Sequence, residues 1–104
     1  MIQFEKIGAI GKITLNRPDK YNAFVRDMAL ELQKKLDECS SDETIRCIII
    51  SGSGKAFCAG QDLKEATDPN SPTIEEIVQQ HYNPIIKKIR EIKIPVIAAV
   101  NGVA

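Results

Sequence analysis

The residues best suited to chemistry lie in one glycine-rich segment, residues 51–63, with the sequence SGSGKAFCAGQDL. It directly follows residues 47–50, the most apolar strand candidate of the chain. Gly52, Gly54 and Gly60 allow sharp turns and a close approach to a ligand, because glycine has no Cβ to clash at positive φ. Open α/β sheets usually hold ligands in loops that leave the carboxyl ends of buried strands. The segment is therefore predicted to be a binding loop.

Two phosphate-binding loops are excluded by residues inside this segment. A P-loop requires Ser or Thr after its lysine, and Lys55 is followed by Ala56. The dinucleotide fingerprint requires a third glycine three residues after the second, and Phe57 occupies that position. The spacing also fits a simple Gly-Ser-Gly turn followed by a phenylalanine in the core. A binding loop and a structural turn are thus alternatives that spacing alone leaves open.

Four motifs, in their usual order, resemble those of the crotonase (enoyl-CoA hydratase/isomerase) superfamily. Residues 57–63, FCAGQDL, resemble its Phe-x-x-Gly-x-Asp-Leu signature. The other motifs are LNRP at 15–18 with NA at 22–23, TIRCIII at 44–50, and PVIAAVNG at 95–102. The likeness extends over essentially the whole chain.

Three details are most similar to one branch of the superfamily, the ring-1,2-epoxyphenylacetyl-CoA isomerases of bacterial phenylacetate breakdown. They are Gln61, YNP at 82–84 and NGVA at 101–104. This likeness implies a reaction in which the ring epoxide opens to an oxepin-CoA. A 2-enoyl-CoA hydratase and a Δ3,Δ2-enoyl-CoA isomerase are alternatives on the same scaffold. An alternative of another class is a catalytically incomplete acyl-CoA-binding or oligomerisation fragment.

The resemblance also implies the fold and the organisation of the protein. The fold class is α/β, a crotonase-like (ClpP/crotonase) spiral of ββα turns, and residues 1–104 would form the N-terminal part of a single domain. The C-terminal part would lie outside this chain, so we expect the 104-residue chain alone to be inactive. The full-length protein is expected to form a homotrimer or hexamer. No cofactor is expected, since CoA is part of the acyl-CoA thioester substrate.

In this family the binding loop stabilises a thioester enolate, and the resemblance implies the same here. The enolate oxygen would accept a hydrogen bond from the main-chain N–H of Gln61, and one such donor is typically worth about 2.7–4 kcal/mol. A second donor would belong to a loop that begins at Gly102 and continues past Ala104. Because the main chain donates, the Gln61 side chain is expected to be replaceable. CoA is expected to contact Lys20, Asn22, Ala23, Ala59, Gly60, Gln61, Asp62 and Leu63.

Other reactive side chains are given no catalytic role. By the resemblance, Asp62 braces the loop near the adenine end of CoA. His81, the only histidine, is interpreted as a packing or surface residue. Cys58 is interpreted as a small apolar filler, and Glu65 has no partner that singles it out. The acid-base carboxylates of the family lie downstream of the part represented here.

The composition excludes several classes of partner. Fourteen basic and fourteen acidic residues cancel, so the chain carries no electrostatic footprint for nucleic acid or an anionic membrane. The longest apolar runs have the length of a strand, which is too short to span a bilayer. The start of the chain lacks the features of a signal peptide. Three cysteines without metal-ligand spacing predict reduced thiols, no metal and a cytoplasmic location.

The apolar pattern predicts a hairpin, a helix and a buried strand in the first half of the chain. Residues 2–4 and 13–15 alternate, with Gly8 and Gly11 between them. Residues 25–39 carry a helical stripe, and Asn22 is expected to cap this helix. The unbroken apolar run at 47–50 predicts a strand covered on both faces.

The second half predicts one long helix followed by a strand. Thr73 and Glu76 form a capping-box pattern at the start of the helix. Pro84 is expected to kink or split it, with Asn83 capping the second half. Residues 96–100 are predicted to form a last buried strand, parallel to 47–50 in a right-handed crossover.

Overall fold

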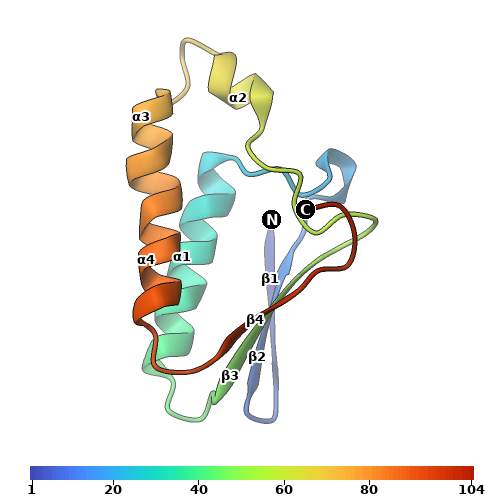
Figure 1. Ribbon diagram of the computed structural model, residues 1–104, viewed down its shortest axis with the longest axis vertical. Coiled ribbons are helices and arrows are strands. Elements are labelled where there is room, and N and C mark those ends of the chain that lie inside the picture. The colour runs from blue at the N-terminus through green and yellow to red at the C-terminus, as the bar shows by residue number, and fades with distance from the viewer.

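The computed structural model describes all residues, 1–104, as one four-stranded sheet with helices packed on one face (Figure 1). The strand order is β1-β2-β3-β4. The strands are β1 Ile2–Ile7, β2 Ile10–Leu15, β3 Cys47–Gly52 and β4 Val96–Ala99. The helical elements are η1 Pro18–Lys20, α1 Arg26–Ser41, α2 Leu63–Thr67, α3 Ile74–Glu76, the π-helical η2 Ile77–Tyr82 and α4 Asn83–Glu91.

The predicted hairpin and parallel crossover are confirmed. β1 and β2 pair in antiparallel register from Ile2 opposite Leu15 to Ile7 opposite Ile10. Gly8 makes the turn between them at a φ of +58°, which glycine adopts without a steric cost. β2 pairs parallel with β3, and β3 parallel with β4, so each parallel pair is joined by a helical connection.

The core lies between the sheet and α1. Apolar residues of α1 are spaced three to four apart, so they fall on one helical face and pack against the inward side chains of β2 and β3. Burying each leucine or isoleucine of this set contributes about 1.5–3 kcal/mol. The helical members are Met28, Ala29, Leu32, Leu36 and Cys39, and the strand members are Ile13, Leu15, Ile48 and Ile50.

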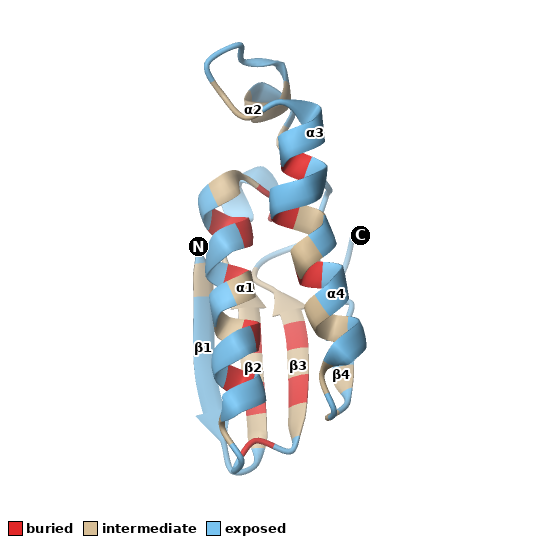
Figure 2. Ribbon diagram, turned by 90° about the vertical axis from the view of Figure 1, so that its left-hand side faces the viewer, coloured by how far each residue is buried: buried red, intermediate tan, exposed pale blue.

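Two predictions of burial are wrong. In β3 only Ile48 and Ile50 are buried, while Cys47 and Ile49 are half-buried. β4 is an edge strand whose Ile97 is 49% exposed. The physical reason is that α1 and α4 lie together over one face of the sheet, which leaves the other face without a covering layer (Figure 2).

The second helical region begins as predicted. The Thr73 hydroxyl accepts from the Glu76 N–H while the Glu76 carboxylate accepts from the Thr73 N–H, a complete capping box. None of the helices of the chain combines the length and apolar composition needed to cross a lipid bilayer.

Pro84 was expected to kink or split this region, and the structure changes there from the π-helical η2 to α4, which begins at Asn83 with the proline in its first turn. Asn83 does not cap α4, whose N-cap is Tyr82. The backbone runs through η2, where the Asn83 N–H donates to the Val78 carbonyl five residues earlier. A proline has no N–H, so Pro84 cannot donate to the Gln80 carbonyl. The side chain of Gln33, on α1, donates to that carbonyl at 2.8 Å. A π-helical turn and a neighbouring helix thus accommodate the proline.

Candidate functional site

The glycine-rich segment leaves the carboxyl end of β3 and turns back beside the loop that precedes α1 (Figure 1). Gly54 and Gly60 adopt φ values of +75° and +114°, as the predicted sharp turns require. Gly52 is needed for a different reason, since a Cβ there would lie 2.4 Å from the Ala56 oxygen. The segment is therefore a tight loop in which glycine is required both for turning and for close approach of the backbone to itself.

Asn22 holds this loop from the side of the first loop. It is completely buried and adopts a φ of +58°. Its Oδ1 accepts from the Arg17 N–H at 2.7 Å, and its Nδ2 donates to the carbonyls of Ser53 and Ala56 at 3.0 and 2.9 Å. The prediction that Asn22 caps α1 is wrong, because its side-chain partners lie in the glycine-rich segment. Its predicted contact with CoA stays a prediction, made for a residue that is completely buried in this structure.

Asn101 holds the same loop from the side of the last strand. Its Oδ1 accepts from the Gly52 N–H at 3.0 Å, and its Nδ2 donates to the carbonyls of Gly54 and Ala56, both at 3.2 Å. The carbonyl of Val103 accepts from the next two loop amides, those of Phe57 and Cys58. The residues that follow β4 are thereby joined to the glycine-rich segment.

The main-chain N–H of Gln61 is left without a partner. The loop pairs with Phe24 through one parallel bridge, in which the Phe24 N–H donates to Gly60 O at 2.7 Å and the Asp62 N–H donates to Phe24 O at 2.9 Å. Gln61 lies between the two residues that bond to Phe24. In a parallel bridge such a residue points its own N–H and carbonyl away from the partner segment. No group of the chain accepts from the Gln61 N–H. A fixed donor with no internal acceptor is available to a ligand.

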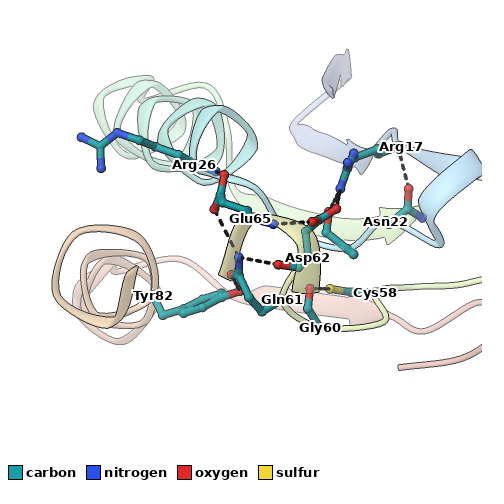
Figure 3. Close-up of polar contacts among 10 residues, drawn as sticks. Arg17, Asn22, Arg26, Cys58, Gly60, Gln61, Asp62, Glu65 and Tyr82 are labelled. Carbon is teal, nitrogen blue, oxygen red and sulfur yellow. Dashed lines mark hydrogen bonds and ion pairs between the residues drawn. The ribbon is translucent and has the colours of Figure 1, made fainter. Parts of the chain in front are cut away.

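Asp62 braces the loop in the way predicted. Its Oδ1 accepts from the Glu65 N–H at 2.9 Å and so caps α2, while its Oδ2 pairs with Arg17 Nη1 at 2.9 Å (Figure 3). The same Nη1 donates to the Ala23 carbonyl. The Glu65 N–H, followed by the Arg17 guanidinium, lowers the pKa of Asp62 below its ordinary value. Asp62 is therefore a carboxylate engaged in structure.

The side chain of Gln61 is also engaged, and this was not foreseen. Its Oε1 accepts from the Tyr82 hydroxyl at 2.5 Å, and its Nε2 donates to Glu65 Oε1 and to the Asp62 carbonyl, both at 3.2 Å (Figure 3). Glu65 Oε2 accepts from the Arg26 N–H, the first amide of α1, at 2.9 Å. Glu65 therefore has specific partners, and one of them, Arg26, lies 39 residues away in the sequence, where local spacing gives no signal.

Most of the predicted contact residues surround one open depression in the surface, of about 600 Å³, which we call the loop depression. Six of the eight line it, while Gly60 is exposed in the same loop and Asn22 is buried and does not line it. A second hollow, of about 550 Å³, lies near the amino end of β3 and contains none of the predicted residues. The loop depression is lined by Asp19, Lys20, Tyr21, Ala23, Ala59, Gln61, Asp62 and Leu63.

His81 and Cys58 both have environments that favour their neutral forms. His81 is buried on η2 with Nε2 at 3.3 Å from Arg26 Nη1, and its Nδ1 has no hydrogen-bond partner. Burial lowers the pKa of His81 and raises the pKa of the half-buried Cys58 thiol. Neither residue lines the loop depression, so both fit a packing role.

The comparisons with known proteins agree with this arrangement of motifs. The sequence model of the enoyl-CoA hydratase/isomerase family matches residues 5–104. The chain is 42% identical over 95 residues to the 1,2-epoxyphenylacetyl-CoA isomerase of Escherichia coli, an alignment that covers 88% of this chain and 36% of that protein. It is 36% identical over 103 residues to a "probable enoyl-CoA hydratase" of Rhodobacter capsulatus, covering 99% and 39%.

Solved structures show the same fold. The structure superposes on that of an enoyl-CoA hydratase from Bacillus anthracis with a TM-score of 0.85 and 34% identity, covering 99% of this chain and 40% of that one. The chain spans less than two fifths of the length of the curated relatives named above. With its fold, its ordered motifs and the family match in agreement, the chain belongs to the enoyl-CoA hydratase/isomerase (crotonase) family.

Proposed function

We propose that this chain forms the part of an acyl-CoA hydratase or isomerase that holds the thioester, with the Gln61 main-chain N–H as one donor of an oxyanion hole. The observation that carries the proposal is the unpartnered N–H of Gln61, a residue that also lines the loop depression. Negative charge develops on a thioester oxygen when the α-carbon loses a proton or a conjugated alkene is attacked. A fixed N–H aimed at that oxygen stabilises the charge.

The surroundings of the depression fit CoA. Lys20 is exposed at the end of η1 and can meet a phosphate as a point charge. Ala23, Ala59 and Leu63 supply apolar walls, and Leu63 is 75% exposed. CoA belongs to the substrate in this proposal, which requires no further cofactor.

The similarity to the 1,2-epoxyphenylacetyl-CoA isomerase favours isomerisation of a ring epoxide to an oxepin-CoA, with the thioester enolate held by Gln61. Hydration of a 2-enoyl-CoA and Δ3,Δ2 isomerisation are the alternatives, and the "probable enoyl-CoA hydratase" relatives support the former. In each case the proposal assigns the acid-base step to a carboxylate that none of the residues lining the loop depression is proposed to supply. The same proposal includes a homotrimer or hexamer in the cytoplasm. The alternative of another class is an inactive acyl-CoA-binding or oligomerisation fragment.

Binding of CoA to the 104-residue chain, measured by isothermal titration calorimetry, tests the first part of the proposal. We expect Lys20→Ala to weaken binding about fivefold, which corresponds to the loss of about 1 kcal/mol from an exposed charge pair. Lys34→Ala, an exposed lysine of α1 away from the depression, is the matched control and should bind as the wild type does. Absence of CoA binding by the folded wild-type chain would refute the assignment of the depression.

The oxyanion role is tested in the full-length protein that carries this chain. Gln61→Pro removes the main-chain donor and should abolish turnover of acyl-CoA thioesters such as crotonyl-CoA, provided circular dichroism shows an intact fold. Full activity in a folded Gln61→Pro variant would rule out Gln61 as a donor. The 104-residue chain alone is expected to show no turnover.

A further inference from the structure

We propose that the Gln61 side chain, held between Tyr82 and Glu65, fixes the direction of its own main-chain N–H, so that Tyr82 and Glu65 are positioning residues of the oxyanion site. This inference rests on the proposed function of the Gln61 N–H. It differs from the expectation drawn from the sequence, under which the side chain at position 61 is replaceable. Three hydrogen bonds of one side-chain amide carry it, two donated by Nε2 and one accepted by Oε1.

The chemistry of the partners determines which way the Gln61 amide faces. A carboxylate such as that of Glu65 can only accept, so it must face the Nε2 of Gln61. The Oε1 of Gln61 is therefore turned to Tyr82, and the phenol must be the donor. A tyrosine is protonated at neutral pH, and burial raises the pKa of Tyr82 further, to about 12. Donor and acceptor are thus uniquely paired along the link.

Glu65 is itself held in place by α1. Its second oxygen accepts from the Arg26 N–H at 2.9 Å, and the residue before, Val25, has no side-chain group with which to cap the helix. The amino end of a helix favours a negative charge. The Glu65 carboxylate therefore links the amino end of α1 to the Gln61 side chain, and its bond to the Arg26 N–H holds it in this position.

Tyr82 is held from the opposite side. Its ring packs edge-to-face on Phe24, with centroids 6.0 Å apart and planes at 71°. Phe24 also binds both neighbours of Gln61: its N–H donates to the Gly60 carbonyl and its carbonyl accepts from the Asp62 N–H. The tyrosine is the last residue of η2, and π-helical turns are frequent at functional sites. One aromatic pair therefore connects the side chain and the main chain of Gln61.

These contacts leave Gln61 little freedom to rotate. The two peptide groups that flank it are bound to Phe24, and its side-chain amide is bound at both ends. An oxyanion donor is effective when its direction is set before the charge develops. Loss of the side-chain link should leave the donor present but less well aimed, which lowers the rate of the chemical step more than the affinity for CoA.

Two variants remove the link with little change in volume. Tyr82→Phe deletes one hydroxyl and keeps the ring on Phe24, while Gln61→Met keeps the length of the side chain without its amide. Gln79→Met is the matched control. It removes an exposed hydrogen bond within the helical region α3–η2, from Gln79 Nε2 to Glu75 Oε1 at 3.3 Å, which does not involve Gln61.

The first measurement uses the 104-residue chain and NMR. In the wild type we expect the Gln61 side-chain NH₂ to be protected from hydrogen exchange. Tyr82→Phe removes the donor to Gln61 Oε1 but leaves the acceptors of Nε2, so it should lower that protection by freeing the amide to move and should shift the main-chain amide resonance of Gln61, whereas Gln79→Met should change neither. If Tyr82→Phe leaves the Gln61 resonances unchanged, the link does not exist in solution and the inference is wrong.

The second measurement uses the full-length protein and a CoA thioester that it turns over. We expect Tyr82→Phe and Gln61→Met each to lower kcat about tenfold, as misplacement of a donor does, with KM within twofold of the wild type. The double variant should be no slower than Gln61→Met. Unchanged kcat in Tyr82→Phe would overturn the positioning role. A wild-type protein that neither binds CoA nor turns over a thioester would instead refute the proposed function, which separates the two failures.

Discussion

Asn22 and Asn101 donate to the same carbonyl oxygen, that of Ala56, from two different segments of the chain. The Nδ2–O distances are 2.9 Å from Asn22 and 3.2 Å from Asn101. Each asparagine also binds a second loop carbonyl, Ser53 for Asn22 and Gly54 for Asn101. The shape of the binding loop therefore depends on side-chain amides supplied by residues that precede and follow it.

We expect Asn22→Asp to destabilise the fold strongly. The variant keeps the shape and the tolerance for positive φ, but it replaces the Nδ2 donor by an oxygen that faces two carbonyls in a buried site. An unsatisfied buried group costs about 1–3 kcal/mol, and more when it is charged. Urea unfolding of the 104-residue chain should therefore show a loss of about 3 kcal/mol or more at pH 7.

Asn101→Asp is the matched comparison for this experiment. Asn101 makes the same kind of contacts but is exposed, so water can solvate the introduced carboxylate. We expect it to cost about 1 kcal/mol. Equal losses in the two variants would contradict the argument from burial.

Asp62 should contribute to stability in a pH-dependent way. The Glu65 N–H and the Arg17 guanidinium lower its folded-state pKa below the ordinary value of 3.8. The stabilisation is therefore complete above that value and is lost as the pH falls through the folded pKa. We expect Asp62→Asn, which can still cap α2, to show a smaller loss of stability between pH 4 and pH 2 than the wild type.

Free energies of unfolding from urea titrations at several pH values test this expectation. Glu5→Gln is a suitable control, because Glu5 is exposed on β1, away from any helix end, and makes no ion pair. Its acid limb should follow that of the wild type. An acid limb in Asp62→Asn as steep as that of the wild type would show that the Asp62 charge does not contribute.

His81 should act in the opposite range of pH. Burial lowers its pKa from the ordinary 6.5, Glu65 opposes the shift and Arg26 adds to it. In the window between the folded pKa and 6.5 the unfolded chain binds more protons, so stability falls as the pH is lowered. We expect the free energy of unfolding to decrease from pH 7 to pH 5 in the wild type.

His81→Phe should remove this dependence. The variant fills a similar volume, cannot be protonated and eliminates the Nδ1 atom that has no partner. Between pH 5 and pH 7 its stability should be flatter than that of the wild type, as measured by thermal unfolding at each pH. The same slope in both proteins would indicate that another group titrates in this range.

Elements defined by local patterns were predictable from the sequence. The helical stripe of Met28, Leu32 and Leu36 and the capping box of Thr73 and Glu76 depend on residues three or four positions apart. Such spacings report directly on helical geometry. The glycine-rich loop and its resemblance to a family signature likewise lie within one short segment.

Features that depend on distant partners were not predictable in the same way. Asn22 looked like a helix cap because the helix is its neighbour in sequence, yet its partners Ser53 and Ala56 lie 31 and 34 residues away. The bond of Tyr82 to Gln61 spans 21 residues. An apolar run such as that of β3 also does not reveal whether one face or two will be covered, since that depends on the layers around the sheet.

The shared Ala56 carbonyl also bears on the order in which the protein folds. Its two partners are separated from it by 34 and 45 residues, and contacts between remote residues require large losses of chain entropy before they form. The β1–β2 hairpin can form early, because its strands are adjacent in sequence. We therefore expect the glycine-rich segment to reach its native shape late, after residues 22 and 101 have both come into contact with it.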